Sequence, residues 1–116
     1  MAFRWKVAVT IASGQSLSGE YDFSGGATRI GIIMPATWTA ASLTFQVASA
    51  SGGTYQELTN EGGTAVNPAV TAGASNSLET SGPYISPFRW FKVRSGTAGA
   101  PVAQGAARIV TFIFQR

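Results

Sequence analysis

The side chains best suited to catalysis are scarce in this sequence. It contains no His and no Cys, and its 116 residues include five acidic and eight basic side chains. Histidine and cysteine supply most general bases, nucleophiles and zinc ligands in enzymes. Because no histidine is present to activate a serine, nucleophilic catalysis is disfavoured as well. The sequence therefore predicts a protein that is not an enzyme and that holds no cofactor or metal ion.

Two pairs of carboxylates lie close together in the sequence. Glu20 and Asp22 alternate within an expected strand, so both point to one face, where a pair could act on a sugar or bind calcium. Glu57 and Glu61 lie on either side of a turn. Neither pair is accompanied by an Asp-rich loop or by further acidic ligands. Solvated carboxylates on a strand surface are therefore the favoured interpretation of both pairs.

Aromatic and basic residues alternate in two segments, 3–6 and 88–94. Such alternation is typical of proteins that stack on single-stranded nucleic acids. In a strand, however, neighbouring side chains lie on opposite faces, and the net charge is only +3, so nucleic acid is not an expected partner. The first segment is instead a candidate contact with another protein, with an ordinary first strand as the alternative. Its residues are Phe3, Arg4, Trp5 and Lys6.

Three further aromatic residues are candidate anchors for a ligand or partner: Trp38, Tyr55 and Trp90. Trp38 follows Pro35 in a loop, where it either stacks on a sugar or partner or folds back to plug one end of the domain. Trp90 shares a strand face with two cations and forms either a small binding patch or an internal cation–π contact. Tyr55, like Tyr84, would serve as a ring platform for a sugar.

The elements that must position these residues are β-strands. Apolar residues at alternate positions predict strands over 4–11, 17–23, 28–34, 43–49, 54–58, 89–95 and 108–115, with glycine-rich turns between them. The signal is weaker over 60–81, which reads as short edge strands or an extended loop. Strands of this length and spacing predict one all-β domain over residues 1–116, an antiparallel β-sandwich for which a jelly-roll-like arrangement is favoured.

The last expected strand carries apolar residues on both faces, which predicts a central place in a sheet or a contact with another subunit. Its candidate oligomer contacts are Ile109, Thr111 and Ile113. All basic residues lie outside the interval from Ile30 to Phe88, which contains three Glu. If the two chain ends pair as neighbouring strands, one part of the domain is basic and another acidic.

The apolar runs are short. None approaches the ~20 residues of a membrane span, and the run after Lys6 is shorter than the roughly 7–15 residues of a secretory signal core. The sequence therefore predicts a soluble protein made in the cytoplasm, with no membrane partner.

Three stretches carry a resemblance to a known group of proteins. They are GIIMPATWTAASLTFQ over 31–46, SGGTYQEL over 51–58 and FKVRSGTAGAPV over 91–102. In this order they resemble small virion structural proteins of tailed bacteriophages. The second stretch also resembles the strand–turn–strand unit of discoidin-like jelly-roll domains, but Gly52 stands where the aspartate of that turn would be, which removes support for a ligand or metal at the turn.

The resemblance implies a capsid decoration (cement) protein that binds the outer surface of the virion through the major capsid protein and stabilises capsomer contacts. It transfers no catalytic residues. It also implies a homo-oligomer, with a trimer favoured, whose head-to-tail interfaces close into a ring. Two alternatives remain: a carbohydrate- or host-surface-binding module of a head fibre or tail, and a structural component of the tail or connector.

Overall fold

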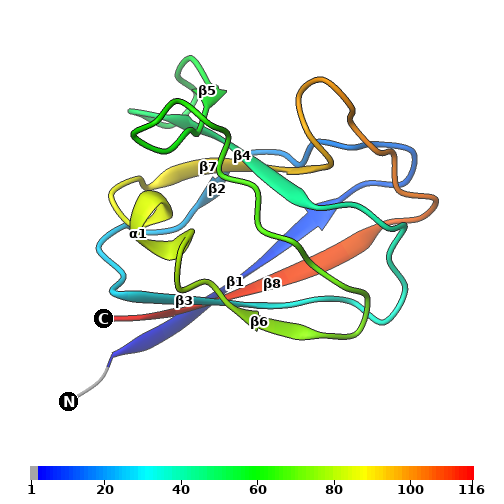
Figure 1. The fold of residues 1–116 in the computed structure, drawn as a ribbon, viewed down its shortest axis with the longest axis horizontal. Helices are drawn as coiled ribbons and strands as arrows, with labels where there is room; N and C mark the ends of the chain where they lie inside the picture. Colours follow the sequence, from blue (N-terminus) through cyan, green and yellow to red (C-terminus); the bar gives the residue numbers. More distant parts are fainter. Residues whose placement is uncertain (1–2) are drawn as a thin grey trace.

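The computed structural model describes residues 3–116 and is nearly all β (Figure 1). Two four-stranded antiparallel sheets form a β-sandwich, which confirms the predicted fold class. Sheet A contains, in spatial order, β1 (Arg4–Ile11), β8 (Arg108–Gln115), β3 (Arg29–Ile33) and β6 (Ser75–Ser77). Sheet B contains, in spatial order, β2 (Tyr21–Asp22), β7 (Trp90–Ser95), β4 (Leu43–Ala48) and β5 (Gln56–Glu57).

The remaining regular element is α1 (Gly82–Ile85), which lies at one end of the sandwich (Figure 1). Met1 and Ala2 of the predicted domain lie outside the described residues. Within the described part, no helix has the length and apolar character needed to cross a membrane.

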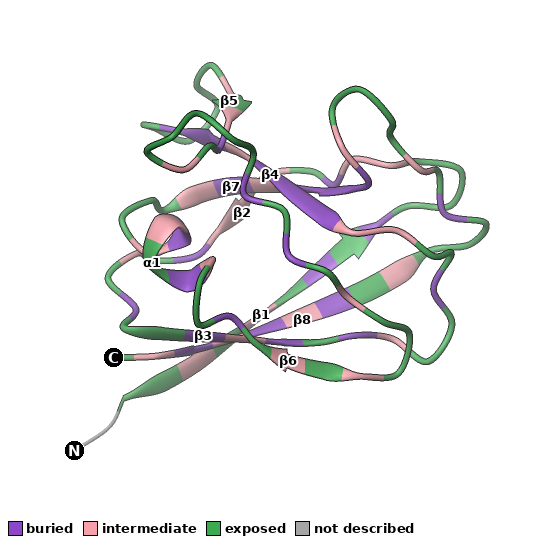
Figure 2. Ribbon diagram, viewed as in Figure 1, coloured by how far each residue is buried: buried purple, intermediate pink, exposed green. Residues whose placement is uncertain are grey.

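Phenylalanine rings from both sheets form the centre of the core. Phe91 of sheet B stacks on Phe23 at 4.3 Å between ring centroids, and Phe112 of sheet A lies 4.9 Å from Phe23. All three rings are at most 1% exposed, and Figure 2 shows buried segments in strands of both sheets. Burying a side chain of this size stabilises the fold by about 1.5–3 kcal/mol. The rings therefore join the two layers.

The first and last strands match their predictions. β1 buries alternate residues increasingly toward its end, from half-buried Trp5 and Val7 to fully buried Val9 and Ile11. β8 lies between β1 and β3, which is the central position, one of the two predicted for it, and the two chain ends pair as neighbouring strands. Alternation was a reliable signal in β1 because one face of sheet A packs on the core and the other faces solvent.

The strand expected over 17–23 is wrong in extent, because only Tyr21–Asp22 forms a regular strand. The backbone N–H of Ser18 donates to the carbonyl of Val93 at 2.8 Å, but the N–H of Val93 donates to the Ser18 hydroxyl at 2.8 Å. A side-chain oxygen thus takes the place of a backbone carbonyl and interrupts the ladder. The segment remains beside β7 through an isolated bridge between Leu17 and Arg94.

The expected solvent face of β4 is wrong as well. Alternation with the apolar residues Leu43, Phe45 and Val47 would place Thr44 and Ala48 in solvent, but they are 1% and 7% exposed. The Thr44 hydroxyl donates to the carbonyl of Gly96 at 2.7 Å and accepts a hydrogen bond from Arg94 at 3.2 Å. Loops and charged side chains therefore cover this side of sheet B.

Candidate functional site

The solvent side of sheet A is the candidate site, and we call it the outer face. It is formed by the residues of each strand that point away from the core. They are Arg4, Lys6, Ala8 and Thr10 of β1, Ile109, Thr111, Ile113 and Gln115 of β8, Arg29, Gly31 and Ile33 of β3, and Ser75 and Ser77 of β6.

Strand register brings the two predicted contact regions together on this face. Lys6 lies opposite Ile113, Ala8 opposite Thr111, and Thr10 opposite Ile109. The candidate partner contact of β1 and the candidate oligomer contact of β8 are therefore neighbours in one sheet. They make a single surface rather than two separate ones.

The outer face is apolar over the part that lies away from Arg4 and Arg29, and it carries few large polar groups there. Ile109 is 54% exposed and Ile33 is 47% exposed. Gly31 lies opposite Ile113, and Ile33 lies opposite Thr111, so β3 extends the apolar area. Small residues beside exposed isoleucines give a flat surface that suits contact with another protein.

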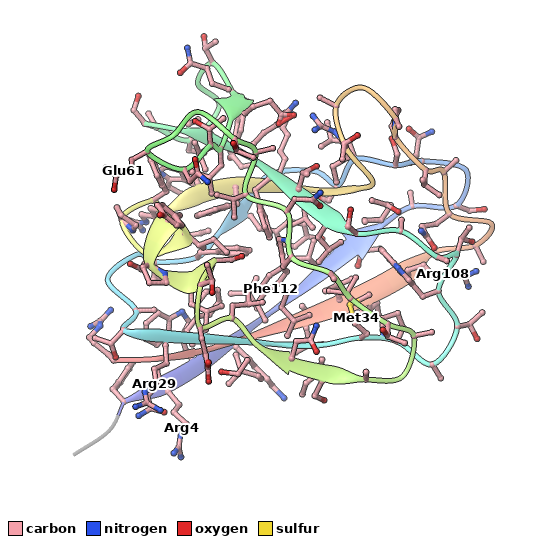
Figure 3. The ribbon with its side chains drawn as sticks, viewed as in Figure 1. Arg4, Arg29, Met34, Glu61, Arg108 and Phe112 are labelled. Atoms are coloured by element: carbon pink, nitrogen blue, oxygen red, sulfur yellow. The ribbon has the colours of Figure 1, made fainter. Side chains whose placement is uncertain are left out.

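One end of the outer face is basic. Arg4 and Arg29 both lie opposite Gln115, on either side of β8, and Figure 3 shows their side chains at the same end of sheet A. No strand of sheet A contains Asp or Glu. Within residues 3–116, the two ion pairs of the structure involve other cations. Arg4, Lys6 and Arg29 therefore form no ion pair among the described residues, although Arg29 lines a depression that also contains Glu79.

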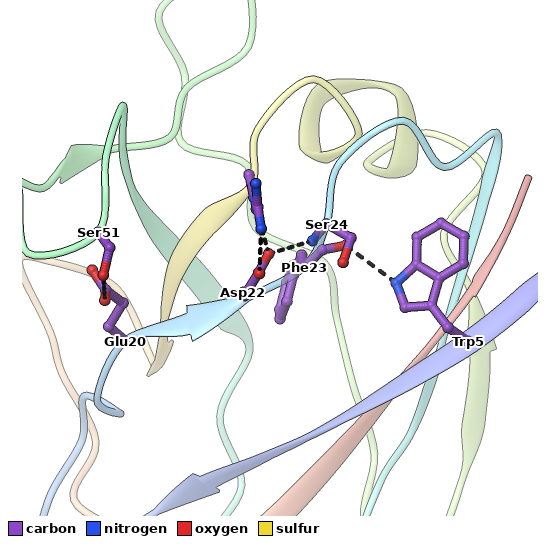
Figure 4. Close-up of polar contacts among 7 residues, drawn as sticks. Trp5, Glu20, Asp22, Phe23, Ser24 and Ser51 are labelled. Atoms are coloured by element: carbon purple, nitrogen blue, oxygen red, sulfur yellow. Dashed lines mark hydrogen bonds and ion pairs between the residues drawn. The ribbon is translucent and has the colours of Figure 1, made fainter.

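The aromatic members of the predicted N-terminal contact behave differently from its cations. Phe3 is 59% exposed, whereas Trp5 is half-buried and donates its indole N–H to the carbonyl of Phe23 at 3.2 Å (Figure 4). The guanidinium of Arg116 lies 4.9 Å from the centroid of the Trp5 ring. A depression of about 220 Å³ lies between Arg4, Trp5, Lys6 and Ile113. Trp5 thus anchors the strand that displays Arg4 and Lys6.

On sheet B, Glu20 is held by the turn that connects β4 and β5. Its carboxylate accepts hydrogen bonds from the Ser51 hydroxyl at 2.7 Å (Figure 4), from the Gly52 N–H at 2.7 Å and from the Tyr55 hydroxyl. The Tyr55 bond, followed by those of Gly52 and Ser51, lowers the pKa of Glu20 below its ordinary value. Burial, with the Glu20 bond, raises the pKa of Tyr55. Glu20 therefore clamps a turn.

Asp22 is paired separately from Glu20. Both of its oxygens accept hydrogen bonds from Arg89 at 2.9 Å, and one also accepts the Ser24 N–H at 2.8 Å. The Arg89 bonds lower the pKa of Asp22. The two carboxylates thus have different partners, and among the described residues no three acidic, His or Cys side chains come together as a metal site would require.

A partly buried ion pair joins the edge strand β5 to β7 across β4. Arg94, which is 7% exposed, pairs with Glu57 and also donates to Thr44. Register explains the pairing, because Glu57 lies opposite Gln46 on β4 and Arg94 lies opposite Thr44 on the same face. The alternation of residues grouped Arg94 with Trp90 and Lys92 on one face of the strand and gave no sign of this pair.

The three predicted aromatic anchors have contacts within the chain. Trp38 is 8% exposed and donates its indole N–H to the carbonyl of Ala41 at 3.1 Å, which favours the plug interpretation. The Trp90 ring is covered by the Arg89 guanidinium at 4.9 Å. The Tyr55 ring is covered by the Lys92 ammonium at 4.6 Å.

Sequence reasoning missed the contribution of β3 to the outer face. The run of apolar residues over 30–34 is typical of a strand buried on both sides, and it gives no sign that Ile33 is exposed. Arg29 at the start of β3 was the available signal, since a cation in line with Gly31 and Ile33 marks the face that meets solvent.

The comparisons with known proteins do not add an assignment to this geometry. Neither the protein-family models nor the curated proteins nor the solved structures provide a match to this chain. The resemblance to phage virion proteins therefore stays a prediction.

Proposed function

We propose that this protein is a non-enzymatic structural protein of a bacteriophage virion that decorates the capsid. In this proposal the outer face docks on an acidic surface of the major capsid protein and stabilises the contacts between capsomers. The observation that carries the proposal is the combination on one surface of exposed isoleucines with Arg4, Lys6 and Arg29, which no ion pair neutralises.

The jelly-roll arrangement is part of the same proposal. Consecutive strands lie in different sheets at every step except from β4 to β5, and the strand orders are β1-β8-β3-β6 and β2-β7-β4-β5. This alternation supports two interleaved Greek keys, as in capsid-associated jelly rolls. The glycan-binding alternative has less support, because the rings of Tyr55 and Trp90 are covered by cations of the same chain.

The experiment adds purified protein to capsids assembled without it and measures bound stoichiometry and the temperature of capsid disruption. We expect saturable addition and higher heat tolerance. Replacing Arg4 and Lys6 by Gln should weaken binding about tenfold or more and flatten its dependence on salt, because exposed interfacial charges steer association.

The matched control is the pair Thr54→Glu and Gln56→Glu, at exposed positions near β5. It changes the net charge by the same amount as Arg4→Gln with Lys6→Gln but leaves the outer face intact. Equal weakening by both pairs would contradict docking through the outer face. Binding to purified tails or to a glycan array, with none to capsids, would favour the alternative functions.

The trimer implied by the resemblance would use part of the same surface, since Ile109, Thr111 and Ile113 lie beside β1. Sedimentation of the free protein distinguishes the two candidate partners of the outer face, which are the capsid and a second copy of the chain. A monomer supports assignment of the outer face to the capsid, and a trimer that Ile109→Lys dissociates assigns this face to a second copy.

A further inference from the structure

β1 is an edge strand whose hydrogen-bonding direction can be read from its register. Phe3 and Arg116 exchange backbone hydrogen bonds in both directions, with the N–H of Arg116 donating to the carbonyl of Phe3 at 2.8 Å. In an antiparallel pair such residues recur at every second position. Trp5, Val7 and Val9 therefore direct their backbone groups toward β8, and Arg4, Lys6, Ala8 and Thr10 direct theirs toward the open side of β1.

Along the open side of β1, one end of the strand is already hydrogen-bonded and the rest is not. The N–H of Thr10 donates to the Tyr21 hydroxyl at 2.9 Å. Among residues 3–116, no backbone partner or side chain takes up the outward N–H or C=O groups of Arg4, Lys6 and Ala8. This stretch is long enough to pair with an extended segment of about five residues.

The side chains along this edge specify what such a segment would carry. On the solvent side lie Arg4 and Lys6, with no carboxylate in any strand of sheet A. On the core side lie Trp5 and Val7, which pack on the core but are only partly buried. A strand placed here would put alternate side chains beside the cations and the others over Trp5 and Val7.

We propose that the open edge of β1 accepts an extended segment of a partner protein, added antiparallel, with acidic residues alternating with apolar ones. The acidic side chains lie beside Arg4 and Lys6, and the apolar ones complete the burial of Trp5 and Val7. This inference rests on the proposed function for the identity of the partner, the capsid protein, but its chemistry does not depend on it.

Charge complementarity favours such a segment over a second copy of this chain. Pairing β1 with its own copy around Lys6 would place two basic strands side by side, which like-charge repulsion disfavours. An acidic strand meets the same cations with attraction. Natural edge strands use lysine and arginine to discourage pairing with neutral strands, so an acidic partner is also the one that this edge does not repel.

The test measures binding of a labelled, acetylated and amidated seven-residue peptide of alternating Glu and Val to the full chain by fluorescence anisotropy. We expect saturable binding, and none of comparable strength to a peptide of alternating Lys and Val. In an antiparallel addition the Glu residues turn their N–H groups toward β1. N-methylation of the Glu nitrogens should therefore weaken binding about tenfold or more, whereas N-methylation of the Val nitrogens should preserve it.

The matched protein variants are Ala8→Pro and Ala8→Ser. Proline removes an outward N–H without changing charge and without touching the bonds to β8, so we expect it to weaken peptide binding about tenfold while Ala8→Ser stays within twofold. The methylated peptides test the wild-type chain even if Ala8→Pro folds poorly. Any other ranking of the two methylated peptides overturns the proposal, as does a free dimer that Ala8→Pro dissociates.

The peptide assay tests strand addition and the capsid assay tests the proposed function, so either proposal can fail without the other. Capsid addition by a chain that does not bind the Glu–Val peptide would overturn strand addition and leave the proposed function standing. Peptide binding with the expected methylation pattern, without addition to capsids, would support strand addition and contradict the proposed function.

Discussion

The two outer surfaces of the sandwich use charged residues in different ways. On sheet B, Arg89 and Arg94 bind carboxylates of the same chain, and Lys92 lies over the Tyr55 ring. On sheet A, Arg4, Lys6 and Arg29 face no carboxylate within their sheet. The difference indicates that charge on sheet B serves the fold, whereas charge on sheet A is available to another molecule.

The apolar residues follow the same division. On sheet B, Thr44 and Ala48 are covered although they point away from the core, and on sheet A, Ile33 and Ile109 are about half exposed. Stability should therefore depend on the outward residues of sheet B much more than on those of sheet A. Matched substitutions on the two sheets can test this division directly.

The largest effect is expected for Arg94→Met. It leaves Glu57 beside an apolar side chain with its charge partner removed, so the free energy of unfolding should fall by roughly 2–3 kcal/mol, less than for a fully buried pair because Glu57 is partly exposed. Arg4→Met on sheet A should change it by less than about 0.5 kcal/mol. Urea denaturation at neutral pH measures both, and similar losses would contradict the division.

A smaller loss is expected for Thr44→Val on sheet B. The substitution keeps the shape of the side chain but removes the hydrogen bonds to Gly96 and Arg94, both of which are buried, and should cost about 1–2 kcal/mol. Thr111→Val on the outer face of sheet A is the matched control and should be close to neutral. Thermal unfolding followed by circular dichroism ranks the stabilities of the two variants. A loss of stability for Thr111→Val equal to that for Thr44→Val would contradict the division between the sheets.

Acidification should weaken the charged contacts of sheet B. The folded pKa values of Glu20 and Asp22 are lowered, so their contribution to stability is present above their ordinary values of 4.5 and 3.8 and is lost as pH falls through the lower folded values. The double variant Glu20→Gln with Asp22→Asn should therefore show a flatter decline of stability below pH 4.5. Midpoints of urea unfolding measured across this range give the slope of stability against pH. An unchanged slope in the double variant would show that these contacts contribute little to stability.

The smallest effect on stability is expected on the outer face. Ile33→Thr combined with Ile109→Thr should leave the free energy of unfolding within about 0.5 kcal/mol per site, because both side chains are already about half exposed. The same variant should weaken addition to capsids, since it removes apolar area from the proposed contact. A variant that unfolds readily would mean that these isoleucines support the fold instead.

Sequence patterns predicted the long strands of both sheets, but β6 lies within 60–81, where the signal was weak. Alternation in β1 reflects one dry and one wet face, and both β1 and β8 formed where expected. β4 lacks a wet face because Arg94 and neighbouring loops cover it, a long-range arrangement that no local pattern encodes. The Ser18 hydroxyl that interrupts the ladder beside β2 is equally invisible in apolar periodicity.

The candidate site was predicted in parts. Arg4, Lys6, Ile109 and Ile113 were assigned to two separate contacts, and their union required the register between the first and last strands. Register depends on the whole sheet, so it could not be derived from either strand alone.

The central place of β8 has a consequence for how the chain reaches its native state during synthesis. β8 separates β1 from β3, and it is synthesised after every other strand of the sandwich. Until residues 108–115 emerge from the ribosome, β1 has no partner strand in sheet A and β3 has only β6, so this layer cannot be completed before then. We expect folding to be concerted, and slow because its defining contacts join the first and last strands of the sandwich.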